Sequence, residues 1–309
     1  MGFFFIVALQ SPPYPVKLPV NVEESSEDIV DVLADDDGLV RHPQIVAPPS
    51  GCHKMAAMAV APVDKPLPLG EVLAETTRVY RARLWPALGL GAVAALGFVV
   101  AGRLPDGFAI VVLALLFTAG YAFGSRLAAG DAFGQAWAQV GRRAAVLLVL
   151  TLVVSVPFSL GVFIRAADPL AGLVFILFAV SWLVFLGFSI PISVCQPEEE
   201  RAGLVHELAE ALRRSIGLAR TEFLHAVGVV AALLVIYGIL GPFLAAALVG
   251  FAENSVEAAF TLSQLMLAPF FFLGLAVLYF EQCARARLAA LDSGRDPGDS
   301  PDAKRSVAP

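Results

Sequence analysis

Long stretches without a charged side chain are the dominant pattern in this sequence. Between residues 67 and 288, the Asp, Glu, Lys and Arg positions leave six charge-free runs of at least 19 residues: 84–102, 107–125, 144–164, 169–197, 223–252 and 258–280. An α-helix needs about 20 mainly apolar residues to cross a bilayer. In lipid, only helices and closed barrels satisfy their own backbone, and no run alternates like a barrel strand. The sequence therefore predicts an all-α integral membrane protein with six transmembrane helices.

Short connections pair the predicted spans into three helical hairpins, with turns near residues 102–106, 165–169 and 251–255. The segment before each hairpin is longer and carries apolar residues at a spacing of three or four. Before the third hairpin, Leu204, Leu208, Leu212 and Ile216 form one stripe, and Glu207 lies off it. This spacing is typical of a helix with one apolar face. We expect each hairpin to follow an amphipathic helix that lies in the cytoplasmic interface of the membrane.

The first two of these units align without gaps at an offset of 60 residues. Gly70-Glu71-Val72-Leu73 then matches Gly130-Asp131-Ala132-Phe133, and Ala82-Arg83 matches Arg142-Arg143. The third unit aligns loosely, with Glu207 near the position of Glu71. The pattern predicts three copies of an interfacial helix followed by a hairpin. Chance similarity between apolar sequences is the alternative.

Arginine is distributed unevenly between the two sides of the predicted membrane domain. Twelve arginines lie on the side of the longer connections, and two, Arg103 and Arg165, lie on the side of the hairpin turns. Because basic residues favour the cytoplasmic side, both termini are expected in the cytoplasm. Arginines at the ends of the amphipathic helices are candidate contacts for the headgroups of membrane lipids. They are Arg78, Arg81, Arg83, Arg142, Arg143, Arg213 and Arg214.

Composition agrees with a membrane protein and assigns the acidity to the tails. Of the 309 residues, 58% are apolar and 16% are charged, and the formal net charge is −6. Residues 1–66 carry four basic and nine acidic residues, whereas residues 67–288 carry fourteen of each. We predict a disordered, acidic and Pro-rich tail over 1–66, a transmembrane domain over 67–288, and a disordered tail over 289–309. Translation starting at Met55 or Met58 is the alternative for the first tail. No basic arm indicates a nucleic-acid partner.

Both ends of the apolar region resemble a known family. The first end contains Leu67-Pro68-Leu69-Gly70-Glu71-Val72-Leu73, Arg78-Val79-Tyr80-Arg81 and Leu84-Trp85-Pro86-Ala87-Leu88, and the second contains Pro269, Leu278-Tyr279-Phe280-Glu281, Arg285 and Arg287. With the helix-then-hairpin rhythm, they resemble bacterial glycerophosphoryl diester phosphodiesterase membrane-domain proteins. The resemblance implies a multi-pass protein of the bacterial inner membrane. It does not imply phosphodiesterase activity, because that chemistry resides in a separate soluble domain for which we expect no room here.

No motif in the chain predicts catalysis, a cofactor or a metal. Gly89-Leu90-Gly91-Ala92-Val93-Ala94 fits G-x-G-x-x-A, but it lies inside the first span, where its glycines favour close helix packing. The four histidines do not form a zinc-ligand pattern, and the three cysteines form neither a CxxC pair nor an even framework. We therefore expect no catalytic, cofactor-binding or metal site.

Two functions remain open at this stage. The first is a non-catalytic inner-membrane module that binds lipid or another membrane protein, which the basic cytoplasmic face favours. The alternative is a permease-like transporter of a hydrophobic or lipidic solute, favoured by the repeats and by Pro157, Pro191, Pro242 and Pro269 within spans. Polar side chains in the spans include Tyr121, Ser155, Ser189, Tyr237, Ser263 and Gln264. The absence of charged residues there counts against an ion-coupled pump. The sequence leaves the oligomeric state open.

Overall fold

The computed structural model describes residues 65–195, 203–251 and 256–292, and its regular structure over these ranges is helical, without strands. Six helices are long and apolar enough to cross a membrane. They are α4 (Leu84–Ala101), α5 (Asp106–Ala128), α7 (Ala144–Ala167), α8 (Pro169–Gly187) with its continuation α9 (Ser189–Cys195), α11 (Phe223–Phe251) and α12 (Val256–Asp292). The prediction of an all-α membrane protein with six spanning helices is confirmed. Most of the two predicted tails, residues 1–64 and 293–309, lies outside the described residues.

The fourth predicted span is two helices in the structure, because α8 ends at Gly187 and α9 begins at Ser189. Pro191 explains this break. Proline has no N–H to donate to the carbonyl four residues earlier, which is that of Gly187, and its ring crowds that carbonyl. Phe188 therefore forms a turn between the two helices, and the Ser189 hydroxyl donates to the carbonyl of Leu186 at 2.5 Å. The turn and all of α9 are buried in the protein.

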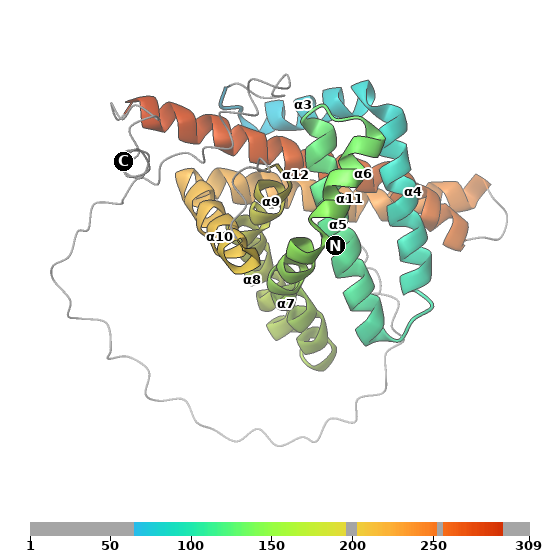
Figure 1. Ribbon diagram of the computed structural model, residues 1–309. Helices are drawn as coiled ribbons and strands as arrows, with labels where there is room; N and C mark the ends of the chain where they lie inside the picture. The colour runs from blue at the N-terminus through green and yellow to red at the C-terminus, as the bar shows by residue number, and fades with distance from the viewer. Residues whose placement is uncertain (1–64, 196–202, 252–255, 293–309) are drawn as a thin grey trace, which may run out of the picture.

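Three helices precede the three pairs of spans: α3 (Leu69–Ala82), α6 (Phe133–Arg142) and α10 (Leu204–Thr221). Each buries a narrow stripe. Val72, Thr76 and Val79 are buried on α3, and Ala136 and Val140 are buried on α6. On α10 the buried residues are Ala211, Ser215, Leu218 and Ala219. In Figure 1, α3 and α6 lie at the end of α4 and α5 that is opposite to the turn joining these two helices.

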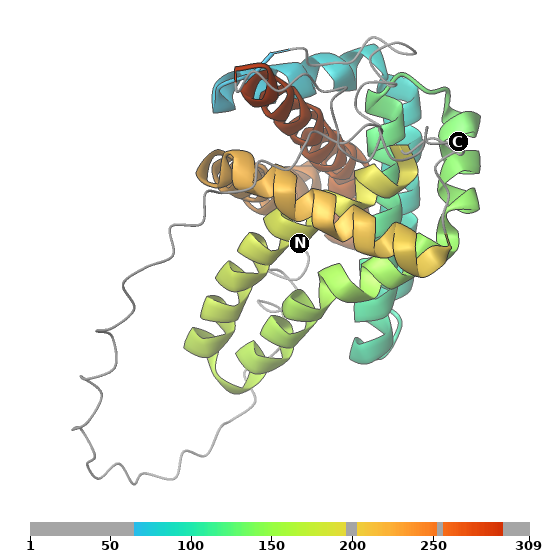
Figure 2. The same ribbon diagram turned by 60° about the vertical axis from the view of Figure 1, so that its left-hand side comes forward.

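The last helix, α12, is the centre of the bundle. It contacts α3, α4, α5, α10 and α11, and every residue from 271 to 284 is buried. A helix that is buried all round belongs to the core of a protein rather than to its surface. Figures 1 and 2 show α12 passing between the other elements, with its C-terminal end beside α3. The predicted pairs also contact each other within the structure, α4 with α5, α7 with α8 and α11 with α12.

Glycines allow α12 to approach its neighbours closely. A Cβ atom added to Gly91 of α4 would overlap the carbonyl oxygen of Leu265 in α12, and one added to Gly120 of α5 would overlap the ring of Phe272. The packing role predicted for Gly91 is therefore confirmed. The Leu265 carbonyl is also the one that Pro269 cannot bond, because it lies four residues earlier in the helix. Gly91 thus provides the space that the proline-distorted part of α12 occupies.

Candidate functional site

Exposed arginines lie on the three helices that precede the spans. Arg78 and Arg81 of α3, Arg142 of α6 and Arg213 of α10 are all exposed. Arg78 donates to Glu75 at 2.7 Å, and Arg213 donates to Glu210 at 3.0 Å. Each pair is formed between residues of the same helix, and about two thirds of each arginine side chain remains exposed to solvent. These guanidinium groups remain accessible to an anion that approaches the surface.

The other three arginines predicted as headgroup contacts face the protein. Arg143 is 4% exposed and forms an ion pair with Glu207 of α10. Arg214 is mostly buried against Glu210 at 2.5 Å, and Arg83 donates to the carbonyl of Gly130 at 2.9 Å. Since an arginine enclosed by protein does not reach a lipid headgroup, Arg143 and Arg214 do not belong to the accessible surface.

Glu210 shows the electrostatic effect of two neighbouring arginines. Burial raises the pKa of its carboxyl group, but the hydrogen bonds and positive charges of Arg213 and Arg214 outweigh burial. The net result is a pKa below the ordinary value for glutamate. Glu210 therefore holds its negative charge at neutral pH and keeps Arg214 against the helix.

Large apolar side chains are exposed on the helices that carry the accessible arginines and at the start of the spans that follow them. Trp85, at the start of α4, is 81% exposed, and Leu84 and Leu69 are also exposed. On the other units, Val205 of α10 is 79% exposed and Leu224 of α11 is 83% exposed. Tryptophan and arginine at the end of a spanning helix are typical of the membrane–water interface.

A buried polar cluster joins the first described residues to α12, and it is not predicted by the sequence. Glu281 is fully buried and forms an ion pair with Arg285, one turn later. The backbone N–H of Leu67 donates to Glu281 at 3.3 Å, and Arg285 donates to the Leu67 carbonyl at 2.9 Å. His225 Nε2 lies 3.6 Å from the same carboxylate. The available signal was the Glu281–Arg285 spacing at the end of an apolar run, but only the fold brings Leu67 to it.

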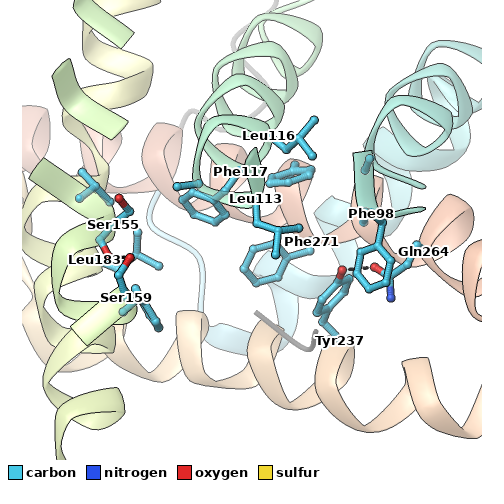
Figure 3. Close-up of a pocket in the computed structure, with 16 residues that line it drawn as sticks. Phe98, Leu113, Leu116, Phe117, Ser155, Ser159, Leu183, Tyr237, Gln264 and Phe271 are labelled. Carbon is cyan, nitrogen blue, oxygen red and sulfur yellow. Dashed lines mark hydrogen bonds between the residues drawn. The ribbon is translucent and has the colours of Figure 1, made fainter. Parts of the chain in front are cut away.

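A cavity of about 90 Å³ lies among the spanning helices and is the second candidate site. All six spans contribute to its walls, which consist of Ala94, Phe98, Leu113, Ala114, Leu116, Phe117, Val154, Ser155, Phe158, Ser159, Leu183, Tyr237, Gln264, Ala268, Phe271 and Phe272. Figure 3 shows Ser155 and Ser159 on one wall and the pair of Tyr237 and Gln264 on another. None of the lining side chains is an Asp, Glu, Lys, Arg or His.

Some polar groups that line the cavity form hydrogen bonds with each other. The Tyr237 hydroxyl donates to Oε1 of Gln264, and the Ser159 hydroxyl donates to the Ser155 carbonyl at 3.0 Å. Gln264 is 2% exposed. Ser155, Tyr237 and Gln264 were among the polar residues noted in the predicted spans, but only the fold brings them to one cavity from α7, α11 and α12.

Over the described ranges, no group of three or more His, Cys, Asp and Glu side chains is arranged to hold a metal ion. No protein-family model, curated protein or solved structure matches this chain. The resemblance to glycerophosphoryl diester phosphodiesterase membrane-domain proteins therefore stays a prediction. In this structure the two segments that carry it meet, because Leu67 belongs to the first and Glu281 and Arg285 to the second.

Proposed function

We propose that this protein is a non-catalytic membrane module whose cytoplasmic surface binds anionic lipid. The observation that carries the proposal is the combination of exposed arginines with exposed large apolar side chains, as at Arg81 and Trp85. An apolar side chain at this level inserts into the acyl boundary, and a guanidinium beside it pairs with a phosphate headgroup. The binding surface comprises Arg78, Arg81, Arg142 and Arg213.

Lipid enrichment around the purified protein tests this function. The full chain is reconstituted in nanodiscs of phosphatidylcholine with a minor fraction of phosphatidylglycerol, and the retained lipids are measured by mass spectrometry. Each basic residue near a membrane surface contributes about 1 kcal/mol to binding an anionic surface. Replacing Arg78, Arg81 and Arg142 together with glutamine is therefore expected to reduce phosphatidylglycerol affinity roughly a hundredfold.

Arg103→Gln is the matched control, because Arg103 is exposed at the opposite turn between α4 and α5. It is expected to leave the enrichment unchanged. Equal enrichment in wild type and in the triple variant contradicts lipid binding at this surface. Stoichiometric co-purification of a membrane protein that the triple variant loses, without lipid enrichment, would instead assign the surface to a protein partner.

We further propose that the module lies in a bacterial inner membrane with both chain termini in the cytoplasm. The uneven distribution of arginine supports this orientation, since twelve lie on one side of the spans and two on the other. A reporter that is active only in the periplasm, fused to the C-terminus, is expected to be inactive. Activity of that reporter, with a cytoplasmic reporter inactive at the same position, contradicts the orientation.

A permease for a hydrophobic or lipidic solute is the second candidate function, and the cavity favours it. Pro157 lies inside α7 between the two lining serines, and Pro269 lies inside α12 next to Ala268. A proline inside a helix leaves a backbone carbonyl without its helical hydrogen bond, and helices weakened in this way around a cavity form the kind of site at which transporters bind solutes. Proteoliposomes containing a fluorescent lipid distinguish the candidates. Protein-dependent movement of the probe between leaflets supports the permease, whereas lipid enrichment without movement supports the binding module.

A further inference from the structure

The cavity among the spans is a poor site for water and a good one for an apolar molecule. Its volume of about 90 Å³ is several times the roughly 15 Å³ that one water molecule requires. Twelve of its sixteen lining residues are Ala, Val, Leu or Phe. A water molecule needs two to four polar partners, which these walls do not supply over most of their area. The cavity fits one end of a lipid and is too small for a whole phospholipid.

The charge of the lining restricts the ligand further. Because the walls contain no Asp, Glu, Lys, Arg or His, a phosphate or an ammonium group would lie there without an ionic partner. Burial of an unpaired ion in a medium of low dielectric constant is strongly unfavourable. The ligand that fits this cavity is therefore uncharged.

Gln264 supplies the polar contact that such a ligand needs. Its side chain is buried and lines the cavity, and its Oε1 atom accepts from the Tyr237 hydroxyl, so a ligand in the cavity would bond to Nε2. The Ser155 hydroxyl faces the same cavity from α7 (Figure 3). A hydrogen bond from this amide to a ligand oxygen contributes about 0.5–1.5 kcal/mol.

We propose that this cavity binds the polar end of a neutral long-chain lipid whose oxygen accepts a hydrogen bond from Gln264 Nε2. A hydroxyl or a carbonyl on an otherwise apolar chain has the required chemistry. The inference deepens the proposed lipid-binding function and rests on it for the class of ligand. The cavity shares no residue with the arginine surface, so each site can fail without the other.

Photolabelling tests the cavity. The full-length protein in phosphatidylcholine nanodiscs is irradiated with a long-chain fatty alcohol that carries a diazirine near its hydroxyl end, and labelled peptides are identified by mass spectrometry. Labels are expected on peptides that contain Tyr237, Gln264 or Phe98. Excess unlabelled alcohol is expected to abolish them, because a defined site saturates. The alkane of equal length is expected to compete about tenfold less well, the equivalent of one hydrogen bond of about 1.4 kcal/mol.

Two variants test whether individual residues of the cavity bind the alcohol. Gln264→Leu is expected to reduce labelling of the cavity about tenfold, and Ala94→Phe, which fills the cavity, is expected to abolish it. The control for the second is Ala246→Phe, at an exposed position of α11, which leaves labelling unchanged. Labelling that does not saturate, or that alcohol and alkane reduce equally, overturns the inference. Since competition is measured on the wild-type protein, these outcomes hold even if a variant fails to fold.

The two proposals give separate results. Loss of phosphatidylglycerol enrichment in the triple arginine variant, with cavity labelling intact, supports lipid binding at the arginine surface and shows that the cavity site does not depend on it. Unsaturable labelling with normal phosphatidylglycerol enrichment overturns the cavity site and leaves the surface function in place.

Discussion

Glu281 is the side chain that ties the beginning of the described chain to its last helix. It is fully buried, accepts from the Leu67 N–H and forms an ion pair with Arg285, which in turn holds the Leu67 carbonyl. A buried ion pair stabilises a fold mainly because removal of one partner leaves the other unpaired in a low-dielectric environment. The sequence placed Glu281 at the end of a span, but it did not indicate that this carboxylate is enclosed.

Glu281→Ala is expected to destabilise the protein by about 3 kcal/mol, because Arg285 and the Leu67 N–H lose a buried acceptor. Reversible unfolding in mixed micelles measures the change. Glu75→Ala is the matched control, since its partner Arg78 is two thirds exposed and stays hydrated without Glu75, so that the pair contributes at most about 1 kcal/mol. Equal losses in the two variants would contradict the structural role of Glu281.

The lowered pKa of Glu210 predicts a pH dependence. A carboxyl group whose pKa falls on folding stabilises the protein above its unfolded pKa, about 4.3, and this contribution is lost as the pH falls through the folded pKa. At pH 7 Glu210→Gln is expected to be less stable than wild type by about 0.5 kcal/mol, discounted for partial exposure of the group. The difference should vanish toward pH 3. A difference that stays constant from pH 7 to pH 3 would exclude the ionised carboxylate as its cause.

At the scale of elements, the six spans could be predicted because their length and lack of charge reflect the solvent, namely the bilayer. Their internal irregularities could be predicted only in part. Pro191 separates α8 from α9, whereas Pro157, Pro242 and Pro269 lie inside continuous helices. Each of the four prolines lacks a backbone N–H. The residues packed around each proline therefore decide whether the helix continues through it or ends there. At Pro269, the surroundings include Gly91, which leaves room for the carbonyl of Leu265.

Gly91→Ala is expected to destabilise the protein by about 1–3 kcal/mol, because the new methyl group overlaps the Leu265 backbone and α4 has to move away from α12. Gly238→Ala is the control in another spanning helix, since nothing lies within 4 Å of the added Cβ. There the higher helix propensity of alanine is expected to leave stability unchanged or raise it by up to about 1 kcal/mol. Thermal unfolding of both variants in detergent gives the comparison, and shifts of the same sign would contradict this packing.

At the scale of the whole molecule, the residue between each preceding helix and its span reaches toward the next unit. Arg83 lies between α3 and α4 and donates to the carbonyl of Gly130, just before α6. Arg143 lies between α6 and α7 and forms an ion pair with Glu207, in the first turn of α10. Glu222, between α10 and α11, pairs with Arg285, which bonds to Leu67 just before α3. The three units are thus joined in a closed ring. The residue that begins the third connection, Glu222, is acidic, whereas Arg83 and Arg143 in the first two are basic.

A double-mutant cycle on Arg143 and Glu207 measures one connection of this ring. Arg143→Met and Glu207→Leu are each expected to cost about 3–5 kcal/mol, because each breaks a buried ion pair. The double variant is expected to be more stable than either single variant, with a coupling energy above 1 kcal/mol from unfolding in mixed micelles. The same cycle on Glu75 and Arg78, whose guanidinium is two thirds exposed, should give less than about 1 kcal/mol. Additive costs at Arg143 and Glu207 would show that the two residues do not act together.

The sequence by itself determined the helical class, the six spans and the basic character of one face, because these follow from hydrophobicity, backbone hydrogen bonding in lipid and residue composition. The tertiary structure alone decided that α12 is the core, that Arg143 faces Glu207 and not solvent, and that Tyr237 meets Gln264 in a cavity. The physical reason is that apolar helices in a membrane have similar surfaces on every side. Their partners are chosen by local shape at glycines and prolines and by a few buried polar contacts between residues far apart in the chain.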